Sequence, residues 1–310
     1  MDFTAEIEKL RRKKNAVILA HYYTFPEVQE IADFVGDSLA LSQKAAATDA
    51  DIILFAGVHF MAETAKILNP DKKVLIPDLA AGCSLADSCN GDDLEKFLKN
   101  YPDHIVLSYI NCSAKVKTLS DVIVTSGNAL KIVNALPKEQ KIVFAPDKNL
   151  GRYINDMMGR NMVLWDGVCF VHNAFTAVQV ADAKKAHPAA EVIAHPECSA
   201  TVLAFADFTG STAAMLKHVA ASDKKEFIVI TEHGILHELK KQNTDKQFFV
   251  INTAENCACS ECSYMKLNTL EKIYLALKNE EPELILDAAT IEAARKPIVK
   301  MLEMSKATMP

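Results

Sequence analysis

The chain has 310 residues, half of them apolar, and a formal net charge of −6 from 34 basic and 40 acidic side chains. A chain of this length can form one to three domains with sizeable cores, and its acidic balance argues against nucleic-acid binding, which usually needs a basic excess. No membrane partner is expected, because no apolar run reaches the roughly 18 residues that a spanning helix needs.

The first part of the chain alternates short apolar runs with helical patterns. A continuous apolar run over 16–22 predicts a buried strand, and Pro26 suits the first turn of a helix. The expected elements, in chain order, are a helix over 2–15, a strand over 16–22, a helix over 26–35, a helix opening at Gly36-Asp37-Ser38 and running to about 47, a strand over 51–57, a helix over 61–68 and a strand over 74–77.

The same alternation continues in two further stretches. Strands are expected over 105–110, 122–125, 141–145 and 162–165, and then over 191–194, 206–209, 227–231 and 248–252. Short apolar strands that alternate with helices favour parallel sheets with helical crossovers. Two amphipathic helices over 268–277 and 291–304 close the chain, and we expect them to pack back on its first part.

Chemically similar residues recur at a nearly constant interval. His21, Tyr109 and His195 end equivalent strands, 88 and 86 residues apart. A cysteine closes each stretch: Cys83, Cys169 and a cluster of Cys257, Cys259 and Cys262. Self-similarity at a fixed period indicates a repeated structural unit.

This period predicts the fold class and the domains. We expect an α/β fold of three pseudo-symmetric, three-layer α/β/α units, with short and mainly parallel sheets around a central active site. The expected domains are 1–84 together with 265–310, then 85–170, and then 171–264. Because ligands bind beyond the carboxyl ends of parallel strands, the polar strand ends are the expected site residues.

A serine or threonine recurs at a similar offset in each unit, near a probable helix start. Free N–H groups at a helix N-terminus bind carboxylate or phosphate without a basic side chain. Each residue taken alone is explained at least as well by helix capping. Their repetition favours a small anionic substrate, held by Ser38, Ser126, Ser211 and Thr212.

The eight cysteines point to metal or redox chemistry. The first residues lack the pattern of a secretion signal, so a cytoplasmic location is expected, where disulfide frameworks are rare. A lone cysteine is more often a small buried residue, the interpretation given to Cys89, Cys112 and Cys198, but repetition at the unit ends favours ligation. Cys259 and Cys262 form one Cys-x-x-Cys motif, but zinc sites usually pair two such motifs and the sequence has no second one. Three thiolates from distant segments suit a [4Fe–4S] cluster whose open iron acts as a Lewis acid.

Glu197 is the candidate general base, because it lies two residues after His195. Ionised carboxylates of a substrate are expected to raise its pKa toward a useful value. His172, just after a cysteine, is a further histidine near the expected site. The ten glycines form neither a Gly-x-Gly-x-x-Gly nor a Walker A motif, so dinucleotide or ATP binding has no motif support.

Nearly the whole chain resembles the quinolinate synthases, iron–sulfur enzymes of de novo NAD synthesis. The matching phrases, in family order, are His21-Tyr22-Tyr23, Gly36-Asp37-Ser38, Leu75-Ile76-Pro77, Thr125-Ser126, Pro146 to Leu150, Cys169 with His172, His195 to Cys198, and Cys262 with Met265-Lys266. The resemblance implies a central [4Fe–4S] cluster held by Cys83, Cys169 and Cys262. It also implies a transferase that condenses iminoaspartate with dihydroxyacetone phosphate to quinolinate, losing phosphate and water, with L-aspartate oxidase as a possible transient partner.

The resemblance also implies the roles of the site residues. Glu197 and Tyr109 are expected to transfer protons, and His21 and His195 to orient substrate and stabilise charge. Tyr23 and Asn111 are expected to line the site, and Ser38, Ser126, Ser211 and Thr212 to hold phosphate or carboxylate groups. Cys257 and Cys259 depart from relatives that have one cysteine there, and they could form a redox-sensitive pair with each other or with Cys262.

Two other functions fit the residues. One is a different [4Fe–4S] hydro-lyase acting on a small hydroxy acid, which shares the cysteines but not the substrates. The other is a non-catalytic metal-binding or redox-sensing protein, which needs the cysteines but not His21, Tyr109, Asn111 or Glu197.

Overall fold

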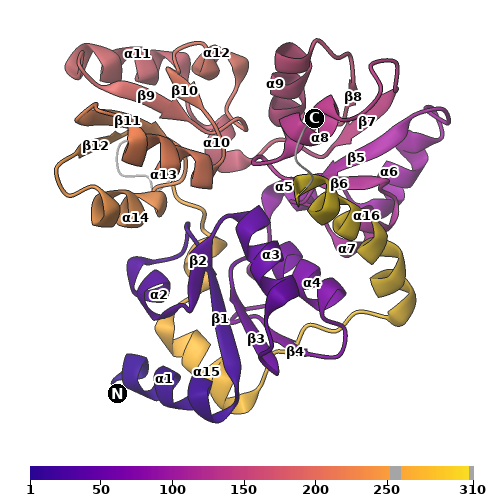
Figure 1. Cartoon of the computed structure of the whole chain (residues 1–310), viewed down its shortest axis with the longest axis vertical. Coiled ribbons are helices and arrows are strands. Elements are labelled where there is room, and N and C mark those ends of the chain that lie inside the picture. Colours follow the sequence, from indigo (N-terminus) through magenta and orange to yellow (C-terminus); the bar gives the residue numbers. More distant parts are fainter. Residues whose placement is uncertain (252–259, 307–310) are drawn as a thin grey trace.

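The computed structural model describes residues 1–251 and 260–306 and contains three α/β units arranged around a common centre (Figure 1). The first sheet consists of β1 (Ala16–His21), β2 (Phe34–Gly36), β3 (Ile52–Ala56) and β4 (Lys73–Leu75). The second consists of β5 (Ile105–Tyr109), β6 (Val122–Val124), β7 (Ile142–Ala145) and β8 (Val163–Leu164). The third consists of β9 (Glu191–Ala194), β10 (Phe208–Thr209), β11 (Glu226–Ile230) and β12 (Gln247–Val250).

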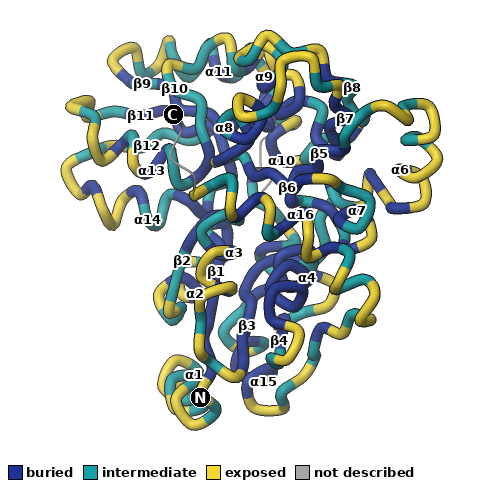
Figure 2. Tube along the Cα trace, turned by 45° about the vertical axis from the view of Figure 1, so that its right-hand side comes forward, coloured by how far each residue is buried: buried dark blue, intermediate teal, exposed yellow. Residues whose placement is uncertain are grey.

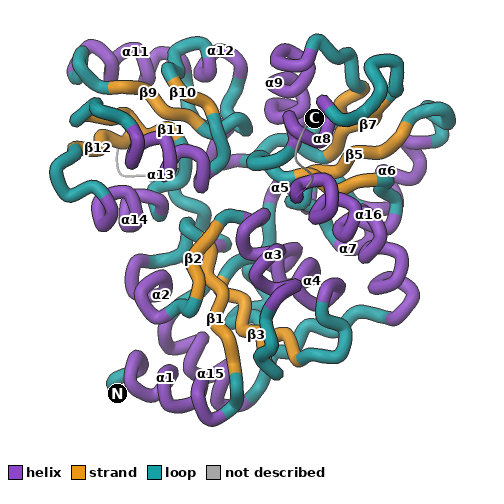
Figure 3. The backbone as a smooth tube through the Cα atoms, in the orientation of Figure 1, coloured by secondary structure: helices purple, strands orange, loops and turns teal. Residues whose placement is uncertain are grey.

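The three sheets share one topology. Their strand orders are β2-β1-β3-β4, β6-β5-β7-β8 and β10-β9-β11-β12, and every pair is parallel. Figure 3 shows the three sheets, one from each unit, placed around the centre of the molecule. The prediction of three similar, parallel α/β units is therefore confirmed.

Helices connect the strands and cover the sheets. In the first unit they are α1 (Phe3–Lys13), α2 (Pro26–Ile31), α3 (Ser38–Ala47) and α4 (His59–Leu68). In the second they are α5 (Ser84–Asp87), α6 (Gly91–Leu98), α7 (Ala114–Thr118), α8 (Ala129–Asn134) and α9 (Lys148–Met158). In the third they are α10 (Phe170–Asn173), α11 (Ala177–Ala186), α12 (Ala200–Leu203), α13 (Thr212–Ala221) and α14 (Ile235–Gln242). The last elements are the 3-10 turn η1 (Met265–Leu267), α15 (Leu270–Asn279) and α16 (Ala288–Lys306).

The two central strands of the first sheet are buried along their whole length. All residues of β1 and β3 are buried, which explains their continuous apolar sequences, because a strand covered on both faces has no solvent side (Figure 2). None of the helices within 1–251 and 260–306 is both long and apolar enough to cross a membrane.

The predicted helix over 26–35 was wrong in its second half. α2 ends at Ile31, and β2 begins three residues later at the edge of the first sheet. Asp33 causes the change, because its backbone N–H donates to Ile18 O at 2.9 Å while its carboxylate accepts from Ile18 N–H at 2.8 Å. Asp121 and Asp207 make the same pair of bonds to the second and third sheets.

The two C-terminal helices pack against different parts of the molecule. α15 packs against α1 and β3 of the first unit, as expected. α16 instead contacts α7, α8 and β6 of the second unit as well as α4 of the first, so the expectation that it packs on the first unit was wrong for most of its surface (Figure 1). α16 therefore joins two units.

Candidate active site

One cavity of about 70 Å³ lies where the carboxyl ends of the three sheets meet. Residues of all three units line it, as expected for parallel sheets that share a central site. Nearly all predicted site residues are among them: His21, Tyr23, Ser38, Cys83, Tyr109, Asn111, Ser126, Cys169, His195, Glu197, Thr212 and Cys262. Ser211 lies behind this lining, where its hydroxyl accepts from Ala214 N–H as the cap of α13 and donates to Asp37 at 3.2 Å.

His21 and His195 occupy matching positions at the ends of β1 and β9. In each, Nδ1 accepts the backbone N–H two residues further on, from Tyr23 at 3.1 Å and from Glu197 at 3.4 Å. Burial lowers the pKa of both imidazoles to about 3. Both rings are therefore neutral at neutral pH, with Nδ1 as acceptor and the proton on Nε2.

Glu197 is buried and is held by donors from two units. Tyr109 Oη donates to its Oε1 at 2.5 Å, and His172 Nδ1 lies 2.8 Å from its Oε2. Burial alone raises the pKa of this carboxyl, but His172, His195 and the hydrogen bonds outweigh burial and lower the pKa to about 2. Because His195 is neutral at neutral pH, the hydrogen bonds from His172 and Tyr109 are what stabilise the carboxylate. The pKa is thus lowered by the protein, in the opposite direction to the rise expected from substrate carboxylates.

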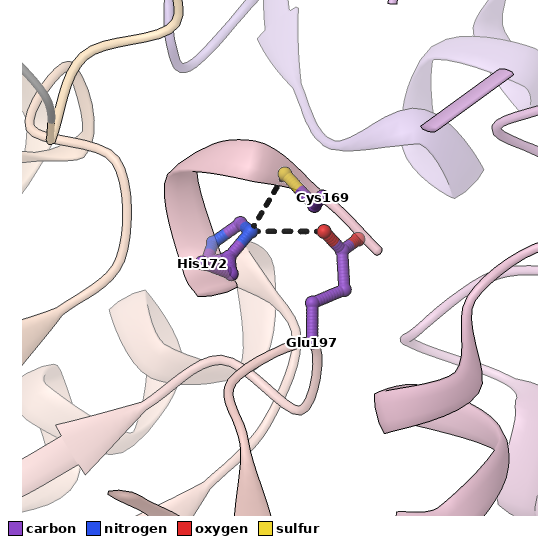
Figure 4. Close-up of side chains that lie close together, drawn as sticks. All are labelled: Cys169, His172 and Glu197. Atoms are coloured by element: carbon purple, nitrogen blue, oxygen red, sulfur yellow. Dashed lines mark hydrogen bonds and ion pairs between the residues drawn. The ribbon is translucent and has the colours of Figure 1, made fainter. Parts of the chain in front are cut away.

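His172 is a site residue that the sequence-based selection left out. Its Nδ1 lies 3.3 Å from Cys169 Sγ (Figure 4). Its Nε2 lies 2.8 Å from Thr231 Oγ1. Its ring stacks on His195 with the centroids 4.5 Å apart. The available signal was its place three residues after Cys169, which puts both on one turn of α10.

Tyr23 joins the first unit to the third. Its hydroxyl lies 2.9 Å from Thr212 Oγ1 and 2.8 Å from Thr231 Oγ1. Burial raises the pKa of the phenol well above its ordinary value. Tyr23 is therefore a neutral hydroxyl, and Thr231 is a second polar residue that the sequence pattern did not reveal.

The polar residues at the other side of the cavity include unpartnered atoms. Ser38 and Thr212 are the first residues of α3 and α13, as predicted. Ser126 lies three residues before α8, so the expected helix start there was wrong. Within the described residues, Asn111 Oδ1 and Thr125 Oγ1 are buried without a hydrogen-bond partner, although both residues line the cavity. Buried polar atoms without partners point to a polar ligand.

Three cysteines, one following the fourth strand of each unit, face the same cavity. Burial raises the pKa of Cys83 to about 12, that of Cys262 to about 11, and that of Cys169 well above its ordinary value. The thiols therefore keep their protons until a cation displaces them. Cys257 and Cys259 lie outside the described residues, so their predicted redox pairing stays a prediction.

A second group of potential metal ligands overlaps the first. Ligand atoms of Cys169, His172 and Glu197 all lie within 4.8 Å of one another (Figure 4). Both ring nitrogens of His172 already make hydrogen bonds, so this group is held together without a metal. The remaining cysteines Cys89, Cys112 and Cys198 are fully buried in apolar clusters, which agrees with a structural role.

Comparison with known proteins gives one consistent result. A family profile described as "Quinolinate synthetase A protein" matches residues 5–303. A quinolinate synthase of Microcystis aeruginosa is 57% identical over 303 residues, covering 98% of this chain and 95% of the relative. One of Chloroherpeton thalassium is 57% identical over 307 residues, covering 99% and 95%. One of Nostoc sp. is 56% identical over 305 residues, covering 98% and 94%.

Proposed function

This chain belongs to the quinolinate synthetase A family, and we propose that it condenses iminoaspartate with dihydroxyacetone phosphate to form quinolinate, losing phosphate and water, for NAD biosynthesis. The observation that carries the proposal is the central cavity, which is lined by three cysteines, one from each unit, together with Glu197 and Tyr109. A condensation of two small acids needs such an enclosed site with both proton donors and acceptors.

The cysteines fit a [4Fe–4S] cluster. Cys83, Cys169 and Cys262, one from each unit, line the same cavity, and burial raises the pKa of all three thiols. Three neighbouring thiols in such a site would lose their protons together only to a bound cation. When bound, the cluster supplies an iron without a protein ligand, which is a Lewis acid for a substrate hydroxyl or carboxylate.

The chain's own residues bind the substrate anions. Ser38 and Thr212 stand at the N-termini of α3 and α13, where backbone N–H groups favour carboxylate or phosphate. Ser126 and Asn111 contribute hydroxyl and amide groups on the second unit. Ser211 acts from behind by fixing the first turn of α13. These neutral donors suit anionic substrates in a protein whose net charge is negative.

Proton transfer falls to a connected set of groups. The Glu197 carboxylate is the base, and Tyr109 Oη, which already donates to it, returns the proton. His172 completes the path to Cys169 and Thr231. The Nε2–H groups of the neutral His21 and His195 are donors for developing negative charge, and the Tyr23 hydroxyl orients substrate from the first unit.

The chemistry of one substrate also implies a partner. Iminoaspartate hydrolyses in water, so it must reach the cavity soon after it forms. We propose that L-aspartate oxidase supplies it by a transient encounter in the cytoplasm.

The test is an anaerobic reconstitution. The purified chain is expected to bind about four irons and four sulfides and to form quinolinate from dihydroxyacetone phosphate and freshly made iminoaspartate. Cys83→Ser, Cys169→Ser and Cys262→Ser should each lose the cluster, and the matched control Cys89→Ser, in an apolar cluster and outside the cavity lining, should keep it. A cluster without quinolinate, together with turnover of malate- or citrate-like acids, would favour the hydro-lyase. No cluster at all would overturn the proposal.

A further inference from the structure

The loop before each cysteine is held to the sheet in the same way in all three units. Three residues beyond the end of the third strand, a backbone N–H donates to the carbonyl that lies two residues before the cysteine. These bonds are His59 N–H to Ala81 O at 2.6 Å, Lys148 N–H to Gly167 O at 2.9 Å, and His233 N–H to Ser260 O at 3.2 Å. The three units thus present their cysteines from equivalent backbone positions.

The residue just before that donor differs between the units. It is Val58 in the first unit, Asp147 in the second and Glu232 in the third. Asp147 Oδ1 accepts the Leu150 N–H at 2.7 Å as the cap of α9, and within the described residues its Oδ2 has no hydrogen-bond partner. Glu232 Oε1 accepts the backbone N–H of Cys262 at 3.0 Å. An acidic side chain therefore accepts the N–H of the cysteine in the third unit, whereas the second unit has an acid that caps a helix and the first has an apolar side chain.

Among the residues that the structure describes, only Glu232 of these three positions forms an ion pair with a basic side chain. Its carboxylate is fully buried and lies 2.9 Å from Lys266 Nζ, while its Oε2 accepts Gly234 N–H at 2.6 Å. Lys266 follows Cys262 by one helical turn, and its backbone N–H donates to Cys262 O at 3.1 Å. The ion pair thus closes over the turn that carries the cysteine.

The same lysine reaches into the first unit. Its Nζ donates to Tyr23 O at 2.9 Å and lies 5.4 Å from the centre of the Phe25 ring. Tyr23 lines the cavity together with Cys262 and Glu232. One buried ion pair therefore connects the third cysteine to the loop that carries the Tyr23 hydroxyl.

We propose that Glu232 and Lys266 are positioning residues, which hold the Cys262 turn against the Tyr23 loop and so fix the third cysteine for the cluster. This inference rests on the proposed function in one respect, that Cys262 is a cluster ligand. A buried ion pair adds little stability over apolar residues, but loss of one partner leaves an uncompensated charge. Groups that support metal ligands typically change metal affinity about 10- to 100-fold when they are lost.

The first test follows iron release from the reconstituted protein to a chelator. Glu232→Gln and Lys266→Met are each expected to release iron about 10- to 100-fold faster than the parent. The double variant should release iron no faster than the faster single variant, because both changes remove the same ion pair. Glu63→Gln is the matched control, since Glu63 is also buried and accepts a backbone N–H, from Ala114 at 2.8 Å, but stands outside the cavity lining. Release from Glu232→Gln at the rate of Glu63→Gln would overturn the proposal.

The second test needs no cluster and so separates this proposal from the proposed function. In metal-free protein, alkylation of Cys262 relative to Cys83 is measured by mass spectrometry. Positioning predicts that both single variants increase this ratio, because either change frees the turn. An electrostatic effect on the thiol alone predicts opposite changes, faster in Glu232→Gln and slower in Lys266→Met, and that result would refute positioning. A global loss of folding raises alkylation of both cysteines equally, and it too would refute the specific role. If the parent binds no cluster but the ratio of Cys262 to Cys83 alkylation rises in both variants, the proposed function fails, whereas the positioning of the Cys262 turn by Glu232 and Lys266 is supported.

Discussion

Tyr109→Phe isolates the hydroxyl that holds the Glu197 carboxylate. The ring of Tyr109 is almost fully buried at the end of β5, so phenylalanine preserves its packing and removes only the hydrogen bond to Glu197 Oε1. His172 remains as the donor to the other carboxylate oxygen. The variant therefore tests one bond in an otherwise intact site.

The expected loss depends on what the hydroxyl does. A hydrogen bond to a charged group contributes about 1.5–3 kcal/mol, which corresponds to a fall of about 10- to 100-fold in kcat/KM if Tyr109 only stabilises the carboxylate. If Tyr109 also delivers a proton, the fall should reach about 10²- to 10⁴-fold and should appear in kcat. The assay is anaerobic quinolinate formation, normalised to iron content, with Tyr153→Phe as a half-buried tyrosine control outside the cavity.

The dependence of activity on pH shows in which direction Tyr109→Phe moves the pKa of Glu197. The Tyr109 hydrogen bond favours the ionised carboxylate and helps to lower the Glu197 pKa to about 2. Its removal raises that pKa, so activity that requires ionised Glu197 should be lost at a higher pH as the solution is acidified. A variant with parental kcat/KM and an unmoved acidic limb would show that neither Tyr109 nor its bond to Glu197 takes part.

Three further predictions concern stability. Gly234→Ala should lower the free energy of unfolding by about 1–3 kcal/mol, and with it the melting temperature, because a Cβ at this position would lie 2.7 Å from Tyr22 O of the first unit. An unchanged melting curve would show that the two units can move apart at this point without loss of stability. Burial keeps His21 and His195 neutral in the folded protein, whereas in the unfolded chain both protonate near pH 6.5. Below that pH, urea titrations should therefore show the free energy of unfolding falling by about 1.4 kcal/mol per pH unit for each histidine. A free energy of unfolding that stays constant down to pH 5 would contradict the burial of the two rings. Asp121→Ala should cost about 1 kcal/mol in the same assay, since it removes the carboxylate that accepts a main-chain N–H of β5; no loss would show that the edge strand does not need it.

Much of the fold could be predicted from the period of the chain. The intervals between His21, Tyr109 and His195 locate the three central strands, and continuous apolar runs identify them as buried. The edge strand β2 was missed because its sequence continues a helical pattern, and only the bonds of Asp33 to β1 break it. Asp33, Asp121 and Asp207, each 15 residues after the strand residue that it bonds, repeat at the same period, so they were a usable signal.

The site was predictable where chemistry and period coincide, as they do for the cysteines. His172 was marked by its place three residues after Cys169, but its bond to Glu197 follows only from the folded chain. Nothing in the sequence marks Thr231, whose role depends on the first unit bringing Tyr23 to it. The position of α16 was likewise unpredictable, because an amphipathic helix specifies that a face is buried but not which unit buries it.

Repetition of backbone and divergence of side chains together explain how one scaffold makes an asymmetric site. The strand-end positions present His21, Tyr109 and His195, of which two are neutral donors and one is a phenol bound to a carboxylate. The backbone bonds that carry the cysteine loops are the same in each unit, so a side-chain change alters chemistry without moving the frame. The side chain just before the N–H donor can therefore differ between the units, and it is Val58, Asp147 and Glu232 in turn. The third unit uses an ion pair there because its cysteine must also be joined to the first unit through Lys266 and Tyr23.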